Sequence, residues 1–156
     1  MQADATAVAE RLYRECGRSK LCRSAVEYYV AVVKNPCYPP PRRLAKDALR
    51  YYAEFVRRYG MPRCDVKALV AERLRGTALE KYAREAGEFA ELLRRALNIT
   101  SRVAAAVAVI VVAERHGIDV VRYAVAARFG ASDVAVRRWL GRAFKLYAER
   151  AAAGRA

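Results

Sequence analysis

The chain contains few of the side chains on which most enzyme active sites and metal centres depend. Its 156 residues include one histidine, His116, and four cysteines that form no Cys-x-x-Cys pair. Because a structural zinc ion is usually held by four Cys or His ligands, we expect no metal site. A glycine-rich phosphate loop and a Ser/His/Asp or Cys/His arrangement are also missing. The sequence therefore predicts a protein that is not an enzyme and that has no cofactor.

Side-chain amides and long apolar runs are scarce as well. One glutamine and two asparagines are typical of a hyperthermophile, whose proteins avoid thermolabile side chains. The apolar segment at residues 103–113 has about half the length that a membrane span requires. Residues 1–16 are amphipathic and lack the apolar core of a signal peptide. We therefore expect a soluble cytoplasmic protein without a membrane partner.

The cysteines lie only in the first half of the chain, at Cys16, Cys22, Cys37 and Cys64. Intracellular disulfides occur in hyperthermophiles, so disulfides between Cys16 and Cys22, or between Cys37 and Cys64, are one interpretation. Four reduced, buried cysteines are the alternative.

Positive charge, in contrast, is abundant. Thirty Lys and Arg against sixteen Asp and Glu give a formal net charge of +14. The excess is mainly Arg, whose planar fork matches phosphate oxygens and guanine edges. Double-stranded DNA is the first partner to expect, because each neutralised phosphate releases counterions, and the protein would then be associated with the nucleoid. A basic protein without a polyanionic partner is the alternative.

Apolar residues recur at helical spacing, and no stretch alternates with period two for long enough to predict a strand. We predict an all-α fold. The first half, residues 1–60, should form an N-terminal helical domain. Its helices are expected at 4–16, 20–34 and 41–59, with a stiff proline-rich loop at 35–41.

Residues 61–64 are the predicted boundary, and residues 61–150 should form a second domain of five helices. The apolar helix should lie at its centre, with Val107 and Ile110 buried, because it has no polar face. The helices are expected at 65–74, 77–97, 101–117, from 119 onward, and 132–150. The residues expected to begin them are Asp65, Thr77, Thr100 or Ser101, Asp119 and Ser132.

Residues 121–140 match a helix-turn-helix position by position. Gly130 suits the left-handed turn, and Ala126, four places earlier, lets the two helices cross closely. Ser132 is a good N-cap for the second helix. Apolar residues fill the positions where the helices face each other and the rest of the domain: Val125, Phe129, Val136 and Trp139.

The remaining positions would face a major groove, and Arg142 and Lys145 would continue a basic stripe toward the DNA backbone. Asp133 and Gly141 are also among the groove-facing positions. The candidate DNA-binding residues are Ser132, Val134, Arg137, Arg138, Arg142 and Lys145. The alternative is a surface helix whose arginines are only solvated. Elsewhere, Tyr28-Tyr29 and Tyr51-Tyr52 lie among basic residues, where they either stack on unpaired bases or belong to the core.

Four segments of the second half resemble the second cyclin-like repeat of archaeal transcription factor B, the counterpart of eukaryotic TFIIB. They are CDVKALVAERL, ITSRVAAAVAVIVVAE, VRYAVAARFG and ASDVAVRRW. Residues 7–16 resemble the central helix of the first repeat and residues 55–63 its end. The first half would then be a degenerate or partial repeat.

This resemblance implies a factor that binds DNA together with TATA-binding protein, with Val134 contacting a thymine methyl and Arg137 a guanine. Two departures matter. Ala135 replaces the usual threonine, and the zinc ribbon and the linker that enters RNA polymerase are missing, so we expect no polymerase recruitment. Cyclin-like repeats also dock proteins, and a protein-interaction scaffold without DNA binding is the alternative function.

Overall fold

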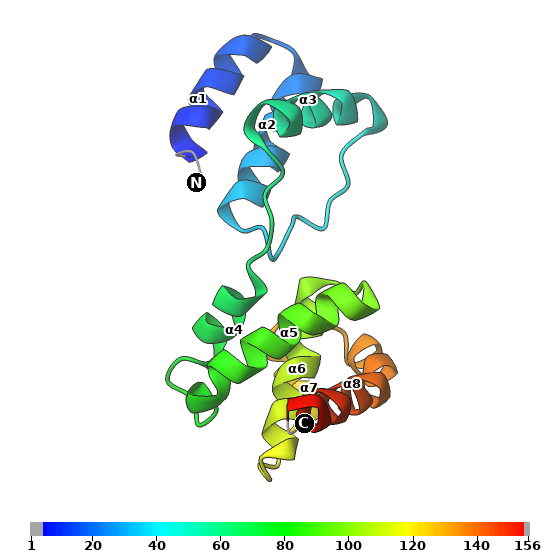
Figure 1. Ribbon diagram of the computed structural model, residues 1–156. Coiled ribbons are helices and arrows are strands. Elements are labelled where there is room, and N and C mark those ends of the chain that lie inside the picture. The colour runs from blue at the N-terminus through cyan, green and yellow to red at the C-terminus, as the bar shows by residue number, and fades with distance from the viewer. Residues whose placement is uncertain (1–4, 155–156) are drawn as a thin grey trace. The chain divides into compact units, whose positions relative to one another are not determined.

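The computed structural model describes residues 5–154, and within this range all regular structure is helical (Figure 1). The predicted all-α fold is confirmed. The elements are α1 (Ala5–Cys16), α2 (Lys20–Lys34), the 3₁₀ turn η1 (Lys46–Ala48), α3 (Leu49–Tyr59), α4 (Val66–Leu74), the 3₁₀ turn η2 (Glu80–Tyr82), α5 (Ala83–Leu97), α6 (Ser101–Arg115), α7 (Arg122–Arg128) and α8 (Asp133–Gly154).

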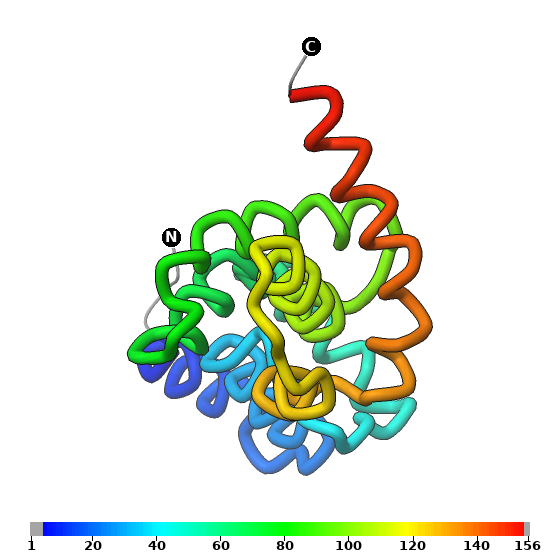
Figure 2. The backbone as a smooth tube through the Cα atoms, turned by 90° about the horizontal axis from the view of Figure 1, so that it is seen from below, coloured from blue at the N-terminus to red at the C-terminus, as the bar shows by residue number. Residues whose placement is uncertain are grey.

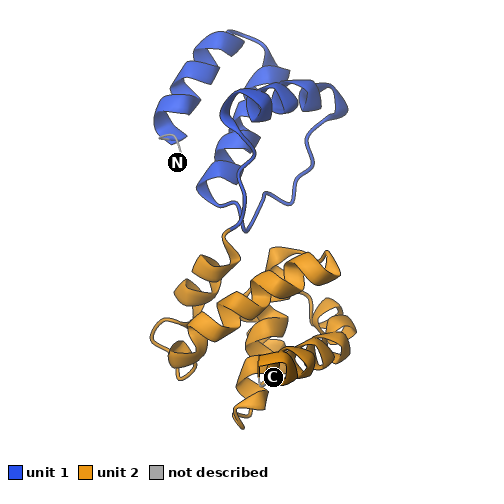
Figure 3. Ribbon diagram, viewed as in Figure 1, with its two compact units in different colours: residues 1–64 blue, residues 65–156 orange. Residues whose placement is uncertain are grey.

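The chain divides into two compact units, Met1–Cys64 and Asp65–Ala156 (Figure 3). The division falls at the end of the segment 61–64 that the sequence indicates as a boundary, four residues after the expected end of the first domain. Each unit has its own buried side chains.

In unit 1, α2 is the central helix, because it packs against both α1 and α3. Its buried residues include Val26 and Tyr29, which join Leu12 of α1 and Phe55 of α3 in one core. Leu12 is the only buried residue of α1.

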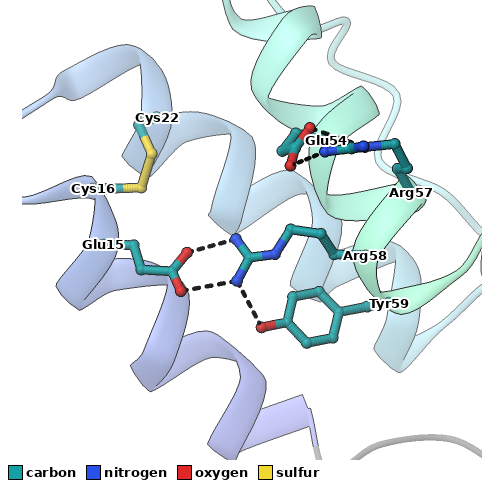
Figure 4. Close-up of polar contacts among 7 residues, drawn as sticks. All are labelled: Glu15, Cys16, Cys22, Glu54, Arg57, Arg58 and Tyr59. Atoms are coloured by element: carbon teal, nitrogen blue, oxygen red, sulfur yellow. Dashed lines mark hydrogen bonds and ion pairs between the residues drawn. A yellow bond between two sulfur atoms is a disulfide. The ribbon is translucent and has the colours of Figure 1, made fainter.

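Covalent and polar contacts hold the ends of these helices together (Figure 4). Disulfides join Cys16 to Cys22 and Cys37 to Cys64. Arg58 of α3 makes a bidentate ion pair with Glu15 of α1, with N–O distances of 2.6 and 2.9 Å. Hydrogen bonds from Arg58 hold the pKa of the Glu15 carboxyl below its usual value. Since both side chains are over a third exposed, this pair contributes modestly to stability.

The third helix begins later than predicted, at Leu49 instead of residue 41. Three prolines at 39–41 cannot continue a helix, and Ala45 still has an extended backbone (ψ 145°). The extended path lets Leu44 pack against the unit 1 core. The expected start at 41 was wrong because the tertiary contact of Leu44 favours an extended chain.

In unit 2, α6 is surrounded by the other helices. It packs against α4, α5, α7 and α8, and Figure 2 shows the last three of these around it. Every residue from Ala104 to Ala113 is buried, with Val107 and Ile110 completely inaccessible. The prediction of a central, wholly apolar helix is confirmed.

Two of the expected helix starts in unit 2, at Asp65 and Thr100, are confirmed, and a third, at Thr77, is wrong. Asp65 caps α4 and Thr100 caps α6, accepting hydrogen bonds from Ala68 N at 3.1 Å and Val103 N at 3.4 Å. Thr77 does not begin α5: its hydroxyl donates to Leu74 O at 2.7 Å and accepts from Leu79 N at 3.2 Å, within the turn between α4 and η2. The helix instead follows η2 and begins at Ala83.

The expectation that Asp119 opens the next helix was also wrong. The α7 helix begins at Arg122, after Val121, which makes no side-chain cap. Residues 116–118 still belong to the turn that ends α6, in which Ile118 N donates to Ala113 O at 2.9 Å. This bond continues the chain reversal at Gly117, so residues 119–121 remain extended or irregular.

Candidate nucleic-acid interface

The turn between α7 and α8 has the conformation expected for its glycine. Gly130 has a positive φ of 63°. Its N–H donates to Ala127 O at 3.0 Å, and the N–H of Ala131 donates to Ala126 O at 2.8 Å. These two bonds form a Schellman motif, which ends α7 sharply and satisfies its last carbonyls. The chain can therefore reverse direction within four residues.

The α8 helix begins at a polar cap. Ser132 Oγ accepts a hydrogen bond from the backbone N–H of Ala135 at 3.3 Å, as the sequence predicts. Asp133 then lies in the first turn, where a negative charge is favourable near the helix N-terminus.

Packing fixes the angle between the two helices. Ala126, Phe129 and Val136 are at most 1 % exposed, whereas Val125 and Trp139 are half-buried. All five lie inside or at the edge of the packed face. Ala126 is buried, and its small side chain is suited to a close crossing of two helices. The inward face of α8 continues with Leu140 and Ala143.

The outward face of α8 is an exposed stripe, which we call the α8 stripe. Its members recur at the three- and four-residue spacing of one helix face. Val134 is 63 % exposed. The α8 stripe consists of Val134, Arg137, Arg138, Gly141 and Lys145, all of which are exposed.

Gly141 is unusual because it lies in the interior of a helix. Glycine there is less favourable than alanine by about 0.5–1 kcal/mol. A Cβ atom at this position would meet no atom within 4 Å, so no packing requirement within the chain explains the glycine. The missing side chain instead leaves a low point on the α8 stripe, where another surface can approach the helix backbone.

The cations near this surface fall into two groups. Arg122 and Arg128 have structural contacts: Arg122 makes a bidentate pair with Glu114 at 2.7 and 2.8 Å, and Arg128 donates to Arg73 O at 3.0 Å. Hydrogen bonds from Arg122 lower the pKa of the Glu114 carboxyl. These contacts fasten α7 to α6 and α4, and no local sequence pattern indicates them.

The second group points outward. Arg137 Nη2 lies 2.7 Å from Asp133 Oδ2, one helical turn away, and the Arg137 side chain is still 66 % exposed. Arg142, beside the α8 stripe, lies 5.6 Å from the ring centre of Trp139. The side chains of Arg138 and Lys145 are exposed. The predicted residues from Ser132 to Lys145 therefore lie at the N-terminus of α8 or on its exposed side.

A polar cluster that sequence reasoning missed lies where α5, α6 and α8 meet. Glu85 accepts a hydrogen bond from the Tyr147 hydroxyl at 2.7 Å and contacts His116 Nε2, also at 2.7 Å. The ring of Tyr82 stacks on that of His116. Burial, followed by the bond to Glu85, raises the pKa of Tyr147. Glu85 is 31 positions from His116 and 62 positions from Tyr147. Sequence spacing alone therefore could not indicate this cluster, which links three helices.

The tyrosine pairs of unit 1 take part in packing. Tyr29 is buried and its hydroxyl donates to Gly60 O at 2.8 Å. The ring of Tyr52 makes edge-to-face contacts with Tyr28 and Tyr29. These contacts favour the core interpretation of the tyrosines over stacking on bases.

Neither a family model, nor a curated protein, nor a solved structure matches this chain. Among residues 5–154, no group of His, Cys, Asp and Glu side chains has an arrangement suited to a metal ion. None of the helices in the same range is both long and apolar enough to cross a membrane.

Proposed function

We propose that the protein is a DNA-binding transcription regulator in which α7, the turn and α8 form a helix-turn-helix. The observation that carries this proposal is the α8 stripe. Its side chains are exposed and mainly basic, while the opposite face of the same helix is buried. A helix with this polarity, preceded by a glycine turn and a second short helix, has the form that enters a major groove.

The roles of individual residues follow from their chemistry. Arg137 donates two hydrogen bonds to a guanine, and Val134 contacts a thymine methyl. Arg142 and Lys145 lie farther along α8 and contact phosphates. Ser132 lies at the N-terminus of α8, where backbone N–H groups favour a phosphate. These are the contacts that the resemblance to transcription factor B implies for Val134 and Arg137.

The partners in this proposal are double-stranded DNA and TATA-binding protein. The chain would act as a core of the transcription factor B type, built from cyclin-like repeats, in the cytoplasm of a hyperthermophilic archaeon and associated with the nucleoid. It would act by binding alone, as a non-enzyme without a cofactor.

A gel-shift experiment on promoter duplexes, with and without TATA-binding protein, tests this function. A protein that covers about six to ten phosphates loses roughly three to five orders of magnitude in affinity between ~50 and ~200 mM salt. We expect this loss, together with tighter binding when TATA-binding protein is present. Absence of a shifted band at ~50 mM salt in both conditions would contradict the proposal.

The alternative function is a protein-interaction scaffold without DNA binding. A specific observation favours it: three large apolar side chains are exposed on or beside α7 and α8. Val121, Tyr123 and Val134 are 55, 70 and 63 % exposed, and such side chains are also typical of protein interfaces. A partner held by them would bind with little dependence on salt, so the salt titration distinguishes the two functions.

A further inference from the structure

The loop between α2 and η1 presents a second group of cations, in unit 1. We call residues 35–46 the basic loop; its last residue, Lys46, begins η1, and Figure 1 shows the rest as a long segment without helix after α2. Arg42, Arg43 and Lys46 are exposed, and none of them has an ion pair among the contacts of the described residues. The basic loop itself contains no acidic residue, and Asp47 follows directly.

Both ends of the basic loop are fastened to unit 1. Cys37 is joined by a disulfide to Cys64, and Ala48, just beyond the loop, is completely buried. Between these points, Leu44 packs against the core and three prolines at 39–41 restrict the backbone. The cations are therefore presented on a restrained backbone, which reduces the entropy lost when a ligand binds.

The charge pattern fits an extended polyanion better than a single small anion. Unit 1 carries thirteen Lys and Arg against six Asp and Glu. Arg42 lies in a bend and Arg43 follows it directly. Both arginines line one groove together with Ser24, Tyr28 and Glu27, and the negative charge of Glu27 disfavours a small anion enclosed there. The exposed guanidinium groups remain available to a larger polyanion.

We propose that the basic loop is a second DNA contact, which binds the phosphate backbone of a duplex through Arg42, Arg43 and Lys46 without reading sequence. That this duplex is the one read by α8 rests on the proposed function. Arginine suits this role because its planar fork donates two parallel hydrogen bonds to phosphate oxygens. Contacts to phosphates add affinity and salt dependence but no base discrimination.

The test compares the salt dependence of duplex binding by the full chain and three double variants. R42A/R43A removes two cations from the basic loop. R11A/R14A is the matched control, because it removes two exposed cations from α1 in the same unit. R137A/R138A removes the α8 contacts. Fluorescence anisotropy is measured from ~50 to ~200 mM salt on a promoter duplex and on a random duplex.

We expect R42A/R43A to reduce the slope of log K against log salt by roughly two, since each phosphate contact contributes about 0.9. The reduction should be the same on both duplexes, and R11A/R14A should keep the wild-type slope. An unchanged slope for R42A/R43A, or an equal reduction for R11A/R14A, would overturn the proposal. Absence of duplex binding by the wild-type chain would overturn it too.

The outcomes separate this proposal from the function of α8. If R42A/R43A changes the slope and R137A/R138A has no effect, the phosphate contact of the basic loop is supported and the helix-turn-helix role is refuted. If only R137A/R138A weakens binding, the helix-turn-helix role is supported and the phosphate contact of the basic loop is refuted. Circular dichroism of R42A/R43A should match the wild type, because both side chains are exposed and lie outside the helices.

Discussion

Replacing Gly141 by alanine should have opposite effects on stability and on DNA binding. The position is exposed in the interior of α8, and an added Cβ would meet nothing within 4 Å. The substitution should therefore stabilise unit 2 by about 0.5–1 kcal/mol, the difference in helix preference between the two residues. For a unit of this size, 1 kcal/mol raises Tm by roughly 4–8 °C.

The same methyl group would lie on the α8 stripe, between Arg138 and Lys145. If this surface meets a DNA groove closely, the methyl acts as overpacking, which typically costs about 1–3 kcal/mol. Binding of the preferred duplex should weaken accordingly while the protein becomes more stable. Urea unfolding followed by the fluorescence of Trp139, the single tryptophan, measures the stability, and anisotropy measures the binding.

Gly87 provides the matched control. A Cβ there would lie 3.3 Å from the Cα of Lys67, so crowding against α4 should offset the gain in helix preference from Gly87→Ala, and DNA affinity should be unchanged while the protein is folded. A G141A variant that is stabilised but binds DNA as tightly as the wild type would refute close approach at Gly141. A destabilised G141A variant would refute the description of the site as open.

Three other predictions follow from individual contacts. Replacing both Cys37 and Cys64 by serine opens a closed loop with a sequence separation of 27. This should destabilise unit 1 by about 3.5 kcal/mol in the chain-entropy account, seen by circular dichroism, with the tryptophan transition of unit 2 unchanged. Asp133→Asn removes a negative charge from beside the α8 stripe, where it pairs with Arg137, and should raise affinity for random duplex severalfold in anisotropy titrations. The lowered pKa of Glu114 beside Arg122 gives stability that is present above the unfolded pKa and is lost as pH falls through the folded pKa. Glu114→Gln should therefore be destabilising in urea at pH 7, and the difference from wild type should disappear at acidic pH.

Helical periodicity and turn chemistry were sufficient to predict most of the fold. The apolar run at 103–113 has no polar face, and burial is the only stable arrangement for it in water. Gly130 and Ser132 act through local backbone geometry, so their roles can be read from adjacent residues.

The errors occur where distant contacts decide the structure. The start of α3 depends on Leu44 reaching the core of unit 1, and the structural use of Arg122 depends on Glu114, on another helix. The cluster around Glu85 joins residues from three helices. No local pattern encodes these pairings. For the same reason, the sequence could indicate which arginines lie on α8 but could not separate them from the arginines that fasten α7.

The central claim is that α8 binds duplex DNA through its outward arginines, and one comparison tests it most directly. Wild type and an R137A/R138A variant are titrated with the same duplex at ~100 mM salt, and anisotropy is recorded. Loss of the bidentate guanine contact alone should cost about 1–3 kcal/mol, so we predict at least several-fold weaker binding by the variant. Equal affinity of the two proteins would remove α8 from DNA binding and would favour the scaffold function.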